Sequence, residues 1–182
     1  KVLKEVINLE LLEKAFKNII KIHNLDTTHG DLTTLNMLVS NNEVYLIDFG
    51  LATKWKDPYG KHMPKKKGLK FFGNVLFGSL KSFRGVTRSR RDDLQSAFHI
   101  LVYLIRGNKL PWNDLIIKFP NFSRDFNKVL IERREADYTN ALIRECPGMR
   151  PLSLTANVEE LRSLLSYVLL LDFKDEPNYE YL

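Results

Sequence analysis

Apolar residues recur early in the chain at the spacing of one helix face. Between residues 8 and 23 they are Leu9, Leu12, Phe16, Ile19 and Ile20, while the lysines of this stretch fall on the opposite side. This period predicts an amphipathic helix whose apolar side packs against the rest of the domain. The predicted helix leads into a polar loop that starts near residue 29.

Two short apolar runs follow, with a polar turn between them. The first run spans residues 37–39, the turn reads Ser-Asn-Asn-Glu at 40–43, and the second run spans 44–47. The second run is rich in β-branched and aromatic residues, so the pattern predicts a β-hairpin. Pairing of the two strands would bring Asn36 and Asp48 close together at one end of the hairpin.

The rest of the chain is predicted to be mainly helical. Residues 93–106 are apolar almost all round, which is typical of a helix buried in the middle of a domain, and Gly107 ends it. We predict two further helical stretches at 122–144 and 158–171, with Pro147 and Pro151 breaking the chain between them. Residues 51–70 are expected to form a loop and 71–85 an ordered but irregular segment. The expected fold class is therefore mainly α (α+β), a helical body with one small hairpin.

The segments that flank the hairpin carry the strongest chemical signal. The preceding segment, 29–36, reads His-Gly-Asp-Leu-Thr-Thr-Leu-Asn, and the following one, 48–50, reads Asp-Phe-Gly. An Asp, an Asn five positions later and an Asp-Phe-Gly triplet beyond a hairpin form the arrangement in which protein kinases place a base and two magnesium ligands. Either segment alone is a weak signal, and a plain hairpin with incidental polar flanks is the alternative.

These residue types suit phosphoryl transfer, which depends mostly on positioning and charge neutralisation. Asp31 is the candidate catalytic residue, because its carboxylate could meet the attacking hydroxyl. Asn36 and Asp48 are the candidate metal ligands, since their hard oxygen atoms could hold Mg²⁺ against phosphates.

The composition sets broad limits on the class of protein. At 182 residues the chain is one domain or part of a larger one, and 44% apolar residues suffice for a core. No apolar run is long enough to cross a membrane, and no Cys/His cluster has the spacing of a zinc site. The single cysteine, Cys146, excludes an internal disulfide and fits a reducing compartment, so we expect an intracellular protein, cytoplasmic or nuclear, without a membrane partner. The chain begins with Lys1 and not Met, which leaves open a start further upstream.

The net charge of +6 is concentrated in one segment. Residues 51–91 contain twelve basic residues and one acidic residue, a net charge of +11, which leaves −5 on the rest of the chain. This segment could be a solvated face or mobile loop, a surface that selects acidic or phosphorylated protein partners, or, less favoured, a nucleic-acid site. The candidate anion-binding residues within it are Lys65, Lys66, Lys67, Arg90 and Arg91.

Further motifs resemble the casein kinase I superfamily, which includes the vaccinia-related kinases. They are Ser-Arg-Arg-Asp-Asp-Leu at 89–94, Leu-Pro-Trp at 110–112 and the closing Asp-Glu-Pro-Asn-Tyr-Glu-Tyr-Leu at 175–182. Gly30 before Asp31 is similar to the vaccinia-related branch, whereas the Asp-Phe-Gly triplet is closer to the casein kinase I branch. The resemblance covers almost the whole chain. It implies a protein kinase-like C-terminal lobe over residues 1–182, with ATP and Mg²⁺ as the cofactors of the family.

The resemblance also implies roles for individual residues. Asp31 matches the catalytic Asp, Asn36 and Asp48 match the magnesium ligands, and Gly50 is expected to give the magnesium loop its backbone freedom. His29 matches a structural histidine of the catalytic loop.

Three residues near the start of the central helix also match the family. Asp93 matches a buried Asp that anchors the backbone of the catalytic loop, whereas its neighbour Asp92 is expected to be more exposed. Arg90 and Arg91 match a pair of arginines beneath the substrate loop, where they could grip a phosphate.

The chain also departs from the family pattern. Thr33 stands where the family has a Lys beside the transferring phosphoryl group, and Asn74 stands where it has a Thr that links the substrate loop to the catalytic Asp. The Gly-rich phosphate loop and strand Lys of the N-terminal lobe are also missing from these 182 residues. Two functions therefore stay open. One is an ATP-dependent Ser/Thr protein kinase that is impaired in this chain, and the other is a pseudokinase module that binds acidic or phosphorylated partners.

Overall fold

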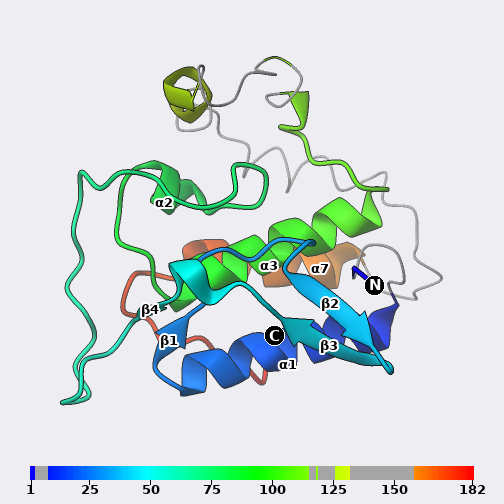
Figure 1. Cartoon of the computed structure of the whole chain (residues 1–182), viewed down its shortest axis with the longest axis horizontal. Helices are drawn as coiled ribbons and strands as arrows, with labels where there is room; N and C mark the ends of the chain where they lie inside the picture. The colour runs from blue at the N-terminus through cyan, green and yellow to red at the C-terminus, as the bar shows by residue number, and fades with distance from the viewer. Residues whose placement is uncertain (3–7, 115–117, 119–125, 132–157) are drawn as a thin grey trace.

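The structure, a computed structural model, describes residues 1–2, 8–114, 118, 126–131 and 158–182. Within these residues the fold is mixed α+β, with a helical body and small antiparallel sheets (Figure 1). Most of the helix predicted at 122–144, together with Cys146, Pro147 and Pro151, lies outside the described residues. None of the described helices is long and apolar enough to cross a membrane.

Helix α1 (Leu9–Asn24) confirms the amphipathic helix predicted at the start of the chain. Asn8 caps it, because its side-chain oxygen accepts a hydrogen bond from the Leu11 amide at 2.9 Å. Ile19 and the other apolar residues of its inner face enter the main hydrophobic core. The helix therefore gives the polar loop that follows a fixed starting point.

The predicted hairpin is also present and lies beside α1 (Figure 1). Strands β2 (Met37–Ser40) and β3 (Glu43–Leu46) pair antiparallel, with Met37 opposite Leu46. The two turn residues, Asn41 and Asn42, have φ angles of 50° and 60°, the left-handed conformation that a tight hairpin turn needs and that Asn tolerates well. The Ile47 amide donates to the Asn36 carbonyl at 3.0 Å, so the pairing continues past both strands toward Asp48.

A second sheet was not predicted. Strand β1 (Thr27–Thr28) pairs with β4 (Thr53–Lys54), which lies inside the segment expected to be a loop. Each strand has only two residues, too few to show a hydrophobic period in the sequence. A 3₁₀ helix, η2 (Phe49–Leu51), connects the hairpin to β4.

Helix α3 (Arg90–Ile105) lies at the centre of the described fold (Figure 1). Most of its residues are buried. It begins three residues earlier than predicted because the Asp92 side chain caps its start, where it accepts the Ser89 amide at 2.8 Å. It ends before Gly107, which has a φ of 68°. The short helix α2 (Leu80–Phe83) precedes it, and α7 (Val158–Leu170) packs against it.

We predict that two leucines of α7 differ sharply in their contribution to stability. Leu165 is 1% exposed in the core, whereas Leu170 is 82% exposed on the same helix. Leu165→Ala should lower the free energy of unfolding by about 2–5 kcal/mol, because it leaves a cavity. Leu170→Ala should change it by no more than about 0.5 kcal/mol. Urea denaturation of both variants tests this packing, and equal losses would contradict it.

Candidate functional site

The segment that contains Asp31 is anchored by the carboxylate of Asp93 at the start of α3. This carboxylate accepts the backbone amides of His29 at 2.7 Å and Gly30 at 2.9 Å, the geometry that the sequence analysis expects of an anchor. It also bonds to Nε2 of His23 at 3.1 Å. Although burial opposes it, the bonds from His23 and the two amides hold the pKa of Asp93 below its ordinary value. The anchor is therefore a charged group.

His29 connects this segment to the end of the hairpin. Its side chain is fully buried, with Nε2 3.0 Å from the carbonyl oxygen of Ile47. The Asp31 amide donates to Nδ1 at 3.3 Å, and the ring packs against Phe49 with the ring centres 4.8 Å apart. These contacts hold the Asp31 and Asp48 segments next to each other.

The Asp31 side chain is half-buried beside these two segments. Burial raises the pKa of its carboxyl group and the nearby Asp48 carboxylate raises it further, while His29, Arg88 and the Asn74 backbone act in the opposite direction. The net result is a raised pKa, chiefly because burial disfavours the charged form of the carboxyl group. The backbones agree with this closeness, because the Asn36 side chain bonds to the Asp31 carbonyl and the Asn36 carbonyl accepts the amide of Ile47, the residue before Asp48.

Asn36 and Asp48 are the two residues expected to hold a metal ion. Asn36 donates its side-chain nitrogen to the Asp31 carbonyl at 2.9 Å, which leaves its side-chain oxygen as the atom that could face a cation. Asp48 is exposed and has a φ of 62°, a left-handed conformation that costs a residue other than glycine free energy and is often found at functional sites.

The donor chemistry at this end of the hairpin fits Mg²⁺. Within the described residues, no group of three His, Cys, Asp or Glu side chains could hold a metal by itself. Mg²⁺ does not need one, since it is usually bound through one or two carboxylates together with water and substrate phosphates. Asn36 and Asp48 would supply the protein oxygens of such a site.

Gly50 has a different role from the one expected. Its φ is not in the left-handed region, so the loop does not use its backbone freedom there. Instead, a Cβ atom at this position would lie 3.2 Å from Oδ1 of Asp48, the atom that accepts the Gly50 amide at 3.3 Å. The glycine therefore provides space for this turn.

The two departures from the family pattern form local hydrogen bonds. Thr33 is buried, and its hydroxyl oxygen accepts the Asn36 amide at 3.1 Å. The side-chain oxygen of Asn74 accepts the amides of Leu76 at 2.8 Å and Phe77 at 3.0 Å. Both side chains stabilise turns, and neither brings a positive charge to Asp31.

Arg90 and Arg91, expected at an anion-binding surface, are buried instead, at 6% and 4% exposed. Arg91 donates to the Asp172 carboxylate at 3.1 Å. Arg90 donates to the Asp175 carbonyl at 3.2 Å, and its guanidinium carbon lies 3.8 Å from the centre of the Trp55 ring. Both side chains fasten the start of α3 to other segments, which leaves them unsuited to gripping a phosphate.

The expectation that Asp92 is more exposed than Asp93 was also wrong. Asp92 is 4% exposed and accepts the Ser89 amide at 2.8 Å and the hydroxyl of Ser79. Burial raises the pKa of Asp92, although Arg91, Ser79 and the Ser89 amide partly offset the rise.

The three lysines expected to bind anions have different surroundings. Lys65 lies 3.6 Å from the Asp172 carboxylate, and Lys67 is exposed. Lys66 lines a cavity of about 520 Å³ whose walls include Phe71 and Phe72. The same cavity is lined by three further basic residues that were not among the predicted anion-binding residues: Lys54, Lys70 and Arg88.

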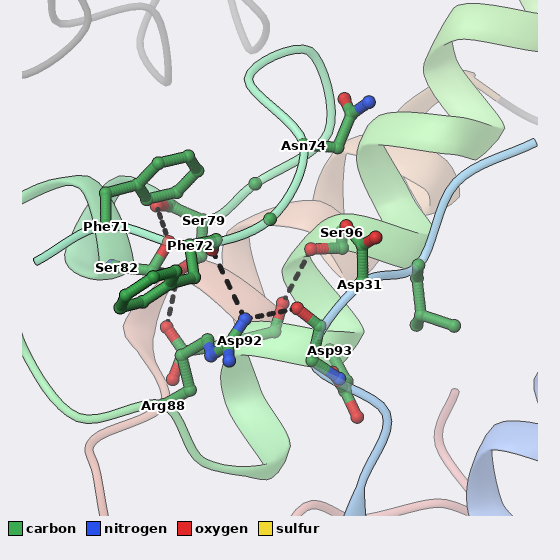
Figure 2. A pocket seen from close by; sticks show the side chains of 14 residues that line it. Asp31, Phe71, Phe72, Asn74, Ser79, Ser82, Arg88, Asp92, Asp93 and Ser96 are labelled. Atoms are coloured by element: carbon green, nitrogen blue, oxygen red, sulfur yellow. Dashed lines mark hydrogen bonds between the residues drawn. The ribbon is translucent and has the colours of Figure 1, made fainter. Parts of the chain in front are cut away.

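Arg88 also forms hydrogen bonds with the backbone around Asp31, which the sequence did not predict. Its Nη1 donates to the carbonyl oxygens of Gly30 and, at 3.4 Å, of Phe72, and its Nη2 donates to that of Leu51 at 3.4 Å. Figure 2 shows Arg88 and Asp31 among the side chains that line one small pocket. No local pattern reveals these bonds, because their acceptors are backbone atoms up to 58 residues away.

Comparison with known proteins gives two kinds of match. The family model of the RIO domain matches residues 1–66. A probable casein kinase I homolog of Encephalitozoon cuniculi (strain GB-M1) is 30% identical over 177 residues, covering 96% of this chain and 53% of that protein. Casein kinase I homolog 2 of Schizosaccharomyces pombe (strain 972 / ATCC 24843) is 30% identical over 168 residues, covering 88% of this chain and 35% of that protein.

A second probable casein kinase I homolog of Encephalitozoon cuniculi is 29% identical over 174 residues, covering 94% of this chain and 51% of that protein. The chain thus spans about half the length of the two Encephalitozoon cuniculi relatives. Together the matches support a protein kinase-like chain.

We predict that removing the Asp93 anchor destabilises the chain. Asp93→Ala strands two buried amides and should lower the free energy of unfolding by about 1–3 kcal/mol or more, while Asp114→Ala, at an exposed carboxylate, should have little effect. Because the folded pKa of Asp93 lies below its ordinary 3.8, its stabilisation is fully present above that pH and is lost as the pH falls below it. Urea denaturation across a pH series tests both statements. A stability gap that widens in acid would contradict the assignment.

Proposed function

On the basis of this protein kinase-like similarity, we propose that the chain forms the C-terminal lobe of a Ser/Thr protein kinase domain of the casein kinase I superfamily. The observation that supports the proposal is a pair of hydrogen bonds of Asn36. Its side chain donates to the Asp31 carbonyl at 2.9 Å, and its own carbonyl accepts the amide of Ile47, which directly precedes Asp48, at 3.0 Å. This arrangement supports transfer of a phosphoryl group from ATP to a protein hydroxyl.

In this proposal Asp31 accepts the hydrogen bond of the substrate hydroxyl and receives its proton. A raised pKa makes this carboxylate a better proton acceptor than an ordinary exposed Asp. The oxygen atoms of Asn36 and Asp48 would hold Mg²⁺, which when bound would neutralise charge at the phosphates of ATP. Asp93 and His29 keep the two segments in place, so that the reacting groups need little rearrangement.

We predict that Asp31 and Asp48 variants fail at different steps. In the whole protein, Asp31→Asn should reduce the turnover number by about 10²–10⁴-fold, the usual contribution of a general base. It should still bind the Mg²⁺ complex of ADP. Asp48→Asn should instead weaken the magnesium-dependent part of ADP binding, because it removes a ligand charge.

Radiolabelled phosphate transfer and calorimetric ADP titration, with and without Mg²⁺, separate these effects, and Asp114→Asn serves as the exposed control. Full activity in Asp31→Asn would disprove the proposed base.

A second candidate function is binding of acidic or phosphorylated protein partners. The observation that favours it is the cavity lined by Lys54, Lys66, Lys70 and Arg88, which gathers four positive charges around an opening large enough for a phosphorylated side chain. Its aromatic walls, Phe71 and Phe72, would suit the apolar part of a peptide. This function requires no turnover, so it also fits a pseudokinase.

We predict that charge reversal inside this cavity matters more than charge reversal beside it. Lys66→Glu with Lys70→Glu should weaken binding of a phosphopeptide and reduce its salt dependence, since fewer charges then face the ligand. Lys61→Glu with Lys67→Glu makes the same change in net charge at exposed lysines outside the cavity and should weaken binding less. Fluorescence anisotropy at two salt concentrations measures both. Duplex DNA that binds more tightly than any phosphopeptide would favour the nucleic-acid alternative.

A further inference from the structure

We propose that Arg88 is a positioning residue that fastens three segments around Asp31: the catalytic loop, the segment that follows Asp48, and the loop that contains Gly73. The inference rests on the proposed function, because it assigns a role at the same site.

The three acceptors of Arg88 come from three separate parts of the chain. Gly30 directly precedes Asp31, Leu51 ends the 3₁₀ helix that follows Asp48, and Phe72 directly precedes Gly73. A guanidinium group suits this task, since its donors point outward from one rigid plane and it has no acceptor of its own. One side chain therefore fixes the relative positions of three backbones.

The packing around Arg88 is too close for larger residues. Gly30 has a φ of 79°, and a Cβ atom there would lie 3.2 Å from the guanidinium carbon of Arg88 and 2.5 Å from the Leu51 carbonyl oxygen. Any side chain at this position would push apart the backbones that Arg88 joins. Gly30 thus makes room for the Arg88 bonds as well as for the turn.

Gly73 lies next to both Arg88 and Asp31. A Cβ atom at Gly73 would lie 3.4 Å from Oδ1 of Asp31 and 3.6 Å from Nη1 of Arg88, which are ordinary van der Waals contacts. The Gly73 backbone therefore adjoins the carboxylate and the guanidinium group. A shift of this loop would change the surroundings of Asp31 directly.

Arg88 is itself held by a rigid support. It directly precedes Ser89, the N-cap of α3, whose backbone amide donates to the buried Asp92 carboxylate at 2.8 Å. The central helix can therefore hold the guanidinium group in place while it bonds to the three loops. Arg88 also brings a permanent positive charge near Asp31. The loop that contains Asp31 has no such charge at Gly30 or Thr33.

Hydrogen–deuterium exchange of the chain tests the proposal without nucleotide or turnover. Arg88→Ala should raise deuterium uptake in residues 29–36, 48–52 and 71–75 together, while uptake in α1 stays at the wild-type level. Arg84→Ala removes the same charge from an exposed position nearby and should change none of the three segments. Increased uptake in only one segment, or the same increase with Arg84→Ala, would overturn the proposal.

If Arg88→Ala does not fold, Arg88→Lys decides the question. A lysine keeps the charge but lacks the planar fork, so it cannot reproduce all three bonds. Its uptake should still exceed the wild-type level in the three segments. Wild-type uptake in this variant would show that charge alone suffices and would overturn the positioning role.

Kinetics of the whole protein provide the second readout. Arg88→Ala should lower kcat by about 10- to 100-fold with little change in the KM for ATP, because misplaced groups slow the chemical step. Unchanged kcat would overturn the positioning role. If the wild-type protein transfers no phosphate, the proposed function fails, and the exchange experiment still decides whether Arg88 joins the three loops.

Discussion

The buried carboxylate of Asp93 is the interaction on which the rest of the site depends. A charge inside a protein is costly unless it is bonded, and Asp93 is bonded by the amides of His29 and Gly30 and by His23. His23 in turn contacts the hydroxyl of Tyr179 at 2.8 Å. Burial raises the pKa of Tyr179 to about 12, so the hydroxyl stays protonated at neutral pH. One carboxylate thus connects α1, the loop that contains Asp31, α3 and the C-terminal segment.

Asp92 and Asp93 show how two adjacent carboxylates can serve different loops. Successive residues of a helix point about 100° apart, so the two side chains contact different loops. Asp93 faces the Asp31 segment, and its pKa is lowered. Asp92 faces Ser79 and the Ser89 amide, and its pKa is raised because burial outweighs its partners. Together they fasten to α3 the loops on either side of the small pocket that includes Asp31 (Figure 2).

The sequence predicted those features that depend on local spacing. Helix α1 and the hairpin each have a hydrophobic period within a short window. The expectation for Asp93 came instead from the family resemblance, because its bonds to His29 and Gly30 cross more than 60 residues. Prediction from the sequence failed for contacts that join distant segments. The pairing of β1 with β4, the burial of Arg90 against Trp55 and the bonds of Arg88 all depend on tertiary structure, and a charged residue looks the same in a sequence whether it is buried or exposed.

The basic segment, residues 51–91, shows most clearly how charge in a sequence differs from charge on a folded surface. As a sequence it carries a net charge of +11, which suggests one continuous cationic surface. In the structure Arg90 and Arg91 are used internally, and Lys65 lies beside Asp172. Only part of the charge gathers around the cavity of Lys54, Lys66 and Lys70. Arg88 combines both kinds of contact, since it lines this cavity and also bonds to the loops around Asp31. A ligand in the cavity would therefore contact the residue that we propose positions Asp31, and under the proposed function one side chain would serve both binding and catalysis.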